Sequence, residues 1–133
     1  LENQGAGYVV ASLGVDSGYV PYTSYSAKTS YMEKNPDIMQ KFTNALQKGM
    51  DYVQKHTPEE IARVIEPQFP ETDLDTITAI VKRYYDQDTW KKNLVFGQEG
   101  FELLQDILED AGELKERTPY EELVNTEFAQ NAS

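Results

Sequence analysis

The chain of 133 residues is long enough for one domain with its own core, and its 26% charged and 11% aromatic residues are typical of a folding sequence rather than a disordered one. Its formal net charge of −11 repels phosphate backbones and anionic headgroups, which argues against nucleic acid and lipid surfaces as direct partners. Without cysteine and with His56 as its single histidine, it offers no disulfide, no thiolate chemistry and little for a metal site.

Targeting and membrane signals are not visible in the sequence. No basic segment precedes an apolar run, as a signal peptide would require, and no apolar run approaches the ~20 residues of a membrane helix. The first residue is leucine rather than methionine. We therefore expect a chain that is processed, excised or incomplete.

Two short β-prone segments are predicted at the front of the chain. Residues 8–13 (YVVASL) form an apolar run bounded by glycines, which is typical of a buried strand. Residues 14–18 are of types that favour a turn. Residues 20–27 are predicted to form a second extended segment, with Pro21 at an edge or strand start. Because two strands make at best a marginal sheet, we expect residues 8–13 to leave unpaired edges or to pair with another copy.

Helical periodicity begins near Thr29 and predicts about five helices. Asparagine followed by proline at positions 35–36, and apolar residues at three- and four-residue spacing, predict a long helix over residues 36–55. The sequence TPEE at 57–60 is a capping box, and the short helix that it opens is broken by EPQFP at 66–70.

The second half of the chain continues this helical pattern. A helix from about Thr72 is predicted to bury a stripe of apolar residues: Leu74, Ile77, Val81 and Tyr84. The only tryptophan, Trp90, lies in a polar loop, where it either caps the helical layer or faces a ligand or partner. A further helix is predicted over 98–111, with Gly112 just past its end. The sequence TPYE at 118–121 repeats the capping-box signal and is predicted to open a short helix through about residue 124. A fraying tail is expected after it, with docking of Phe128 as the alternative.

The order of these segments resembles a known family. It combines GYVVASLG, VPYTSYSAKTSYMEKNPDIMQKFTNALQKGMDYV, TPEEIARVI, FPETDLDTITAIVKRYYDQDTW, GFELLQDILEDAGEL and TPYEELVNTEFA. This arrangement resembles the C-terminal part of bacterial ABC-importer substrate-binding proteins of the NMT1/THI5-like group. That group includes binders of thiamine-pyrimidine precursors, and its relatives bind aliphatic sulfonates, taurine and nitrate. Its members are considerably longer than this chain.

The resemblance implies an α/β fold, namely the C-terminal portion of a type II periplasmic-binding-protein fold, seen here as two short strands followed by about five helices. Residues 1–18 would end the second lobe. Residues 19–27 would form a crossover strand, with Gly18, Val20 and Pro21 as the hinge. Residues 28–133 would complete the first lobe with helices.

The same resemblance places candidate ligand contacts at the lobe junction. Tyr22 and Thr23 are the first candidates, because a tyrosine ring supplies a flat apolar wall and its hydroxyl a directed hydrogen bond. Strand alternation sends these two side chains to opposite faces, so contact by one of them is expected rather than by both. Tyr19, Asp16 and Ser17 would line the rim of the cleft. The alternatives are that Tyr22 packs between lobes and that the others are ordinary turn residues.

The expected function is the capture of a small-molecule solute and its delivery to ABC permease subunits, without enzymatic turnover, cofactor or metal. Nucleic acid is not an expected partner, and the membrane is reached only through a lipid anchor or the permease. The expected location is extracytoplasmic, either the periplasm or the cell surface of a Gram-positive organism as a lipoprotein. Two alternatives stay open: an NMT1/THI5-like pyrimidine-biosynthesis enzyme, whose chemistry needs histidine and cysteine, and a stand-alone helical interaction module.

Overall fold

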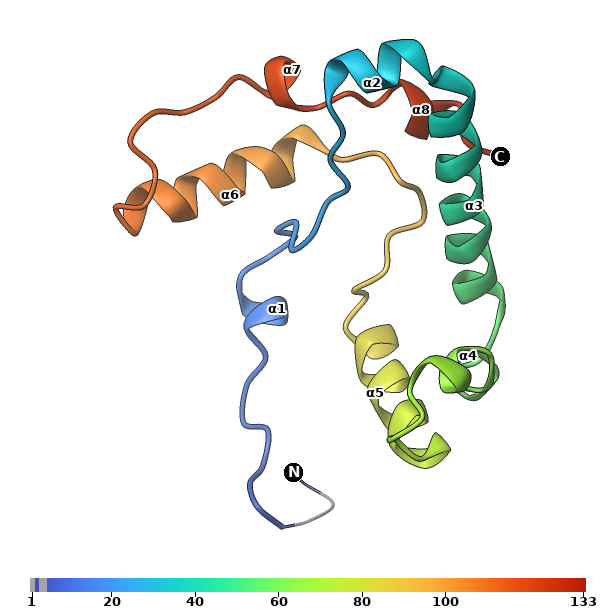
Figure 1. The fold of residues 1–133 in the computed structure, drawn as a ribbon. Helices are drawn as coiled ribbons and strands as arrows, with labels where there is room; N and C mark the ends of the chain where they lie inside the picture. The colour runs from blue at the N-terminus through green and yellow to red at the C-terminus, as the bar shows by residue number, and fades with distance from the viewer. Residues whose placement is uncertain (1, 3–4) are drawn as a thin grey trace.

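The computed structural model describes residue 2 and residues 5–133, and this part of the chain consists of helices joined by loops (Figure 1). In chain order the helices are α1 (Leu13–Asp16), α2 (Thr29–Lys34), α3 (Pro36–Lys55), α4 (Pro58–Ile65), the 3-10 helix η2 (Glu66–Gln68), α5 (Leu74–Asp86), α6 (Gln98–Asp110), α7 (Tyr120–Leu123) and α8 (Glu127–Gln130).

The predicted α/β fold with two strands is wrong, because the described residues contain helices and no strand. Residues 8–12 have no regular structure, and Leu13 begins the single helical turn of α1 instead of ending a strand. Residues 20–27 likewise follow an irregular path without ladder partners among the described residues. Apolar β-prone residues make a strand only where a second segment pairs with their backbone groups. Residues 1, 3 and 4 of the predicted 1–18 segment lie outside the described residues.

The predicted long helix is confirmed at both ends, since α3 spans Pro36–Lys55. Pro36 occupies the first helical turn, where its missing N–H costs no hydrogen bond. Asn35 precedes it but does not cap α3 with its side chain; its Nδ2 donates to the carbonyl of Tyr31 at 3.0 Å and closes the end of α2. At the other end His56 stacks on Tyr52, with ring centroids 3.7 Å apart.

The capping box predicted at TPEE is also confirmed. The Glu60 N–H donates to Thr57 Oγ1, and the Glu60 carboxylate accepts from the Thr57 N–H at 2.8 Å, so two N–H groups of the helix start are satisfied. The helix that follows, α4, ends in η2 around the proline of EPQ.

The core lies between α4 and α5, which form the most extensive helix pair of the described residues. Ile61, Ala62, Ile77 and Val81 are buried there, with exposed fractions of 4% or less. Trp90 packs against this cluster and lies beside the rings of Tyr84 and Tyr85, so it caps the helical layer. Tyr84 itself is 45% exposed, and the buried stripe predicted for α5 therefore stops short of it.

The predicted helix over 98–111 is confirmed as α6, and the short helix predicted after TPYE is present as α7, but the residues around α7 differ from their predicted form. TPYE does not make a capping box: α7 starts at Tyr120 after Pro119, without a side-chain cap. The predicted fraying tail instead forms α8, which packs on α3, and Gln40 Nε2 donates to the carbonyl of Phe128 at 3.0 Å. The short segment EFAQ gains its helical order from this tertiary contact, which local helix propensity does not predict.

The N-terminal segment runs between two helices that are distant in the sequence. In Figure 1 the blue chain passes between α6 on one side and α5 on the other, and it carries α1 at its middle. This path brings residues 12–21 against the C-terminal end of α5 and against α6. The resulting junction is where the candidate site lies.

Candidate functional site

An open cavity of about 560 Å³ lies where the N-terminal segment meets the end of α5. Its wall is formed by Gly14, Val15, Gly18, Tyr19, Arg83, Asp86, Gln87 and Asp88. The volume is in the range of sites that hold small organic ligands. Two segments about seventy positions apart in the sequence therefore make one hollow with apolar and polar walls.

The Tyr19 hydroxyl donates a 2.6 Å hydrogen bond to Asp88 Oδ2 and so links the two walls of the cavity. This hydrogen bond, together with the charge of the Asp88 carboxylate, raises the pKa of Tyr19 above its ordinary value. Asp88 has a φ of +53°, a left-handed conformation that aspartate tolerates better than most residues. Gly18, with a φ of +76°, supplies the second left-handed position, immediately before Tyr19.

Two ion pairs flank the cavity. Arg83 Nη2 lies 2.6 Å from Glu2 Oε2, and Lys82 pairs with Asp86 one helical turn further on. The Glu2 carboxylate also accepts a hydrogen bond from the Val9 N–H at 2.9 Å. That backbone bond, followed by the contact with Arg83, lowers the pKa of Glu2. All four side chains are exposed, so these ion pairs orient the charged groups more than they stabilise the fold.

A third polar link joins the same two segments. Ser12 Oγ donates to Gln87 Oε1 at 3.2 Å, and Gln87 Nε2 in turn donates to Thr89 Oγ1 at 2.8 Å. The cavity thus presents a guanidinium, two carboxylates, an amide and a tyrosine ring. These groups can bind a small polar solute by hydrogen bonds and stack its flat part against the ring.

The structure brings some of the predicted site residues to this cavity and leaves others away from it. Gly18 and Tyr19 line it. Asp16 and Ser17 lie next to it at the end of α1, exposed and outside its wall. Tyr22 and Thr23 lie further along the chain; Tyr22 is 99% exposed and neither lines the cavity. The predicted ligand contacts of Asp16, Ser17, Tyr19, Tyr22 and Thr23 stay predictions.

The predicted hinge residues lie against α6. Val20 and Pro21 are half-buried. A side chain at Gly100 would place its Cβ 3.0 Å from the Tyr19 carbonyl oxygen and 3.5 Å from Pro21 Cδ. Glycine at position 100 therefore permits a close approach of the N-terminal segment to α6.

Sequence reasoning missed the α5 side of the cavity. Arg83, Asp86, Gln87 and Asp88 belong to a stretch that was identified only as a helix end and a polar loop. Charged residues at a helix end are usually solvated, so the presence of these residue types did not predict a binding site. Only the fold, which brings residues 14–19 beside them, makes them candidates.

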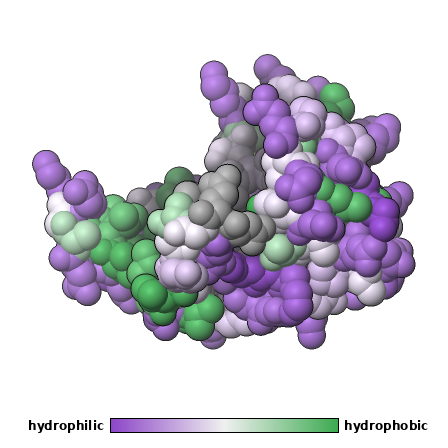
Figure 2. Space-filling model, turned by 90° about the horizontal axis from the view of Figure 1, so that it is seen from below, coloured by the Kyte–Doolittle hydropathy of each residue, from purple (hydrophilic) through white to green (hydrophobic). Residues whose placement is uncertain are grey.

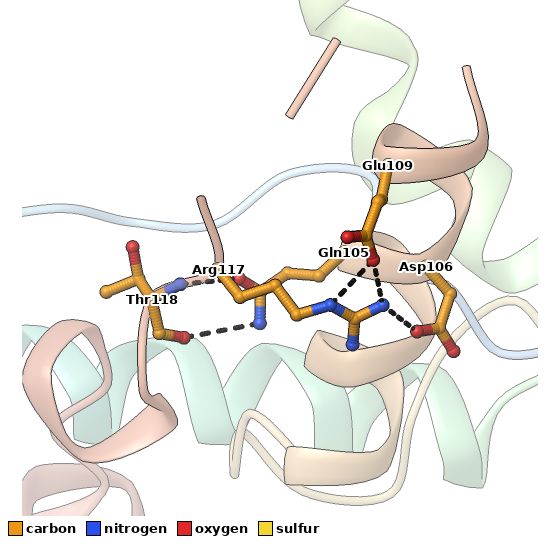
Figure 3. A network of polar contacts seen from close by, with 5 residues as sticks. All are labelled: Gln105, Asp106, Glu109, Arg117 and Thr118. Carbon is orange, nitrogen blue, oxygen red and sulfur yellow. Dashed lines mark hydrogen bonds and ion pairs between the residues drawn. The ribbon is translucent and has the colours of Figure 1, made fainter. Parts of the chain in front are cut away.

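A second cluster of polar side chains lies on α6 and serves the fold rather than a binding site (Figure 3). Gln105 is 8% exposed and binds the backbone of Thr118 twice: Oε1 accepts from its N–H at 2.8 Å and Nε2 donates to its carbonyl at 3.2 Å. Arg117 pairs with Asp106 and Glu109, which raises the pKa of the guanidinium. Together these contacts fasten the loop after α6 to the helix that it leaves.

In residues 2 and 5–133, no three histidine, cysteine, aspartate or glutamate side chains cluster in a way that could hold a metal ion. No helix in that part of the chain is both long and apolar enough to span a membrane.

Comparison with known proteins gives one informative match. The chain is 39% identical over 133 residues to "Putative binding protein YtlA" of Bacillus subtilis (strain 168), and the match covers 100% of this chain and 40% of that protein. The chain thus spans about two fifths of the length of the curated relative it matches. No family model matches the chain, and no solved structure does. The similarity is to a protein named for binding; the NMT1/THI5-like family is not shown.

Proposed function

We propose that the chain is part of the solute-binding component of an ABC importer, which captures a small organic solute and delivers it to permease subunits. The observation that carries this proposal is the cavity between residues 14–19 and 83–88, where hydrogen-bonding groups and a tyrosine ring line the same hollow. The full-chain match to a protein named for binding supports the same class of function.

The solute follows from the family resemblance rather than from the cavity alone. A thiamine pyrimidine precursor or an aliphatic sulfonate is the first choice, with taurine and nitrate next. The protein carries out no covalent step. Its place is extracytoplasmic, and it meets the membrane through a lipid anchor or through the permease.

A binding screen tests the proposal directly. The protein is titrated with a thiamine pyrimidine precursor, an alkanesulfonate, taurine and nitrate, and binding is measured by isothermal calorimetry and thermal shift. We expect saturable one-site binding of one of these solutes and a rise in Tm that grows with solute concentration. No binding of any of the four would contradict the proposed solute classes.

Variants then locate the site. Tyr19→Phe removes the hydrogen bond that links the walls of the cavity, and Asp88→Asn removes the negative charge of its acceptor, while both keep the size of the side chain. We expect each to weaken solute binding by about tenfold, the cost of one hydrogen bond to a charged group. Tyr31→Phe, on exposed α2, is the matched control and should bind as the wild type does. Equal affinities of all three variants would place the site elsewhere.

A further inference from the structure

Residues 5–27 have an unusual composition for this acidic chain. They hold one charged residue, Asp16, where the chain average of 26% would give about six. They also hold four of the nine tyrosines and a run of aliphatic residues. Depletion of charge with enrichment of aromatic residues is the composition of the core of a protein interface, not of a solvated surface.

The same residues are nevertheless open to solvent. Tyr8, Val10, Leu13, Tyr22 and Tyr25, which we call the N-terminal apolar face, have exposed fractions of 76% to 99%. Figure 2, seen from below, shows apolar surface on the side where Figure 1 places α6 and the N-terminal segment, while hydrophilic residues dominate the side of α4 and α5. Isolated exposed apolar side chains are normal, but five within eighteen positions mark an interaction surface.

The backbone of this segment is also largely unpaired among the described residues. Of the N–H groups at positions 8–12, that of Val9 alone donates to a described residue, through the Glu2 carboxylate. The N–H groups at positions 22–27 donate to no described residue. Apolar side chains and free backbone groups are therefore presented together.

We propose that the N-terminal apolar face is an interface with further polypeptide of the same protein, equivalent to the part of the relative that lies outside the match. Three fifths of that relative accompany the segment that this chain matches. The described residues bury five hydrophobic side chains, a small core for their number. A second copy is the less favoured occupant, because two chains of charge −11 repel each other. This inference does not depend on the identity of the solute.

Hydrogen exchange on two forms of the protein tests this inference. One is the isolated 133-residue chain, and the other is the polypeptide as the organism makes it. We expect the amides of residues 8–12 and 22–27 to exchange at least about a hundredfold more slowly in the natural polypeptide, because burial and pairing protect them. We expect the isolated chain to sediment as a monomer that binds a hydrophobic dye.

Equal, rapid exchange in both forms would overturn the inference, and so would a natural polypeptide that consists of these 133 residues alone. Protection that rises with concentration in the isolated chain, together with the mass of a dimer, would assign the face to a second copy instead.

A pair of identical substitutions makes the test independent of how well the isolated chain folds. In the natural polypeptide, Val10→Asp places a carboxylate in the interface and should lower Tm by at least about 5 °C. Val64→Asp, at an exposed valine of α4, is the matched control and should leave Tm within about 2 °C. Equal shifts for the two variants would show that position 10 is no more buried than position 64 and would overturn the inference.

Discussion

The Tyr19 hydroxyl lies 2.6 Å from Asp88 Oδ2, so a single hydrogen bond joins the N-terminal segment to the end of α5 across the candidate cavity. Because the pKa of Tyr19 is raised, the bond is present below the ordinary tyrosine pKa and is lost as the pH rises through the folded-state value. A tyrosine NMR titration between pH 8 and about 12 should show one ring titrating late. Asp88→Asn should reduce this delay, because the acceptor of the hydrogen bond loses its charge, and an unchanged delay in that variant would contradict the assignment.

Much of the helical part could be predicted because its signals are local. The bounds of α3 follow from Pro36 and the spacing of apolar residues, and α4 follows from the reciprocal bonds of Thr57 and Glu60. Such signals act within one helical turn, so no distant residue can overrule them easily.

The errors share a different cause, which is dependence on partners distant in the sequence. Residues 8–13 resemble a strand, yet no described segment pairs with them. Thr118 resembles a cap, but its backbone binds Gln105 instead. The cavity also depends on contacts between distant residues, since Arg83 and Asp88 become site candidates only because Tyr19 lies beside them.

Two glycine-to-alanine substitutions should act in opposite directions. In α3 a Cβ at Gly49 meets no atom within 4 Å, so Gly49→Ala should raise the free energy of unfolding by roughly 0.5–1 kcal/mol. In α6 a Cβ at Gly100 meets the Tyr19 carbonyl oxygen at 3.0 Å, so Gly100→Ala should lower it or displace residues 19–21. Urea denaturation measures both. Equal stabilisation by the two substitutions would show that residues 19–21 do not lie against α6.

The core should depend on Ile77 far more than on Ile80, although both are isoleucines of α5. Ile77 is 4% exposed and Ile80 is 48% exposed. Ile77→Ala should cost about 2–5 kcal/mol, which combines lost burial with a cavity, whereas Ile80→Ala should cost less than about 1 kcal/mol. Thermal denaturation followed by circular dichroism distinguishes the two. A similar loss in both variants would contradict the packing of α4 on α5.

Acid should weaken the starts of α4 and α5. Hydrogen bonds from the Thr57 and Thr76 N–H groups lower the pKa values of Glu60 and Asp73, respectively. The stability that these carboxylates contribute is complete above the carboxyl pKa of the unfolded chain, about 4, and is lost as the pH falls through the folded-state values. Glu60→Gln and Asp73→Asn keep a capping side chain but remove the charge.

The urea midpoint of these two variants, measured from pH 7 downward, should therefore fall less steeply than that of the wild type. The curves should converge at the lowest pH at which the protein stays folded, since the carboxylates are then protonated in the wild type as well. Parallel curves across the whole range would show that the two carboxylates have the same pKa in the folded and unfolded states.

Gln105 should be needed to hold the loop after α6, because its amide is the partner of both backbone groups of Thr118. Gln105→Ala should cost about 1–3 kcal/mol, since the truncation leaves two partly buried polar groups without a partner. Gln98→Ala, at an exposed position where the side chain hydrogen-bonds Glu102, is the matched control and should change stability by less than about 0.5 kcal/mol. Limited proteolysis gives a local measurement: cleavage within residues 111–119 should accelerate in Gln105→Ala and not in Gln98→Ala. Equal cleavage rates in the two variants would mean that the ion pairs of Arg117 suffice to hold the loop.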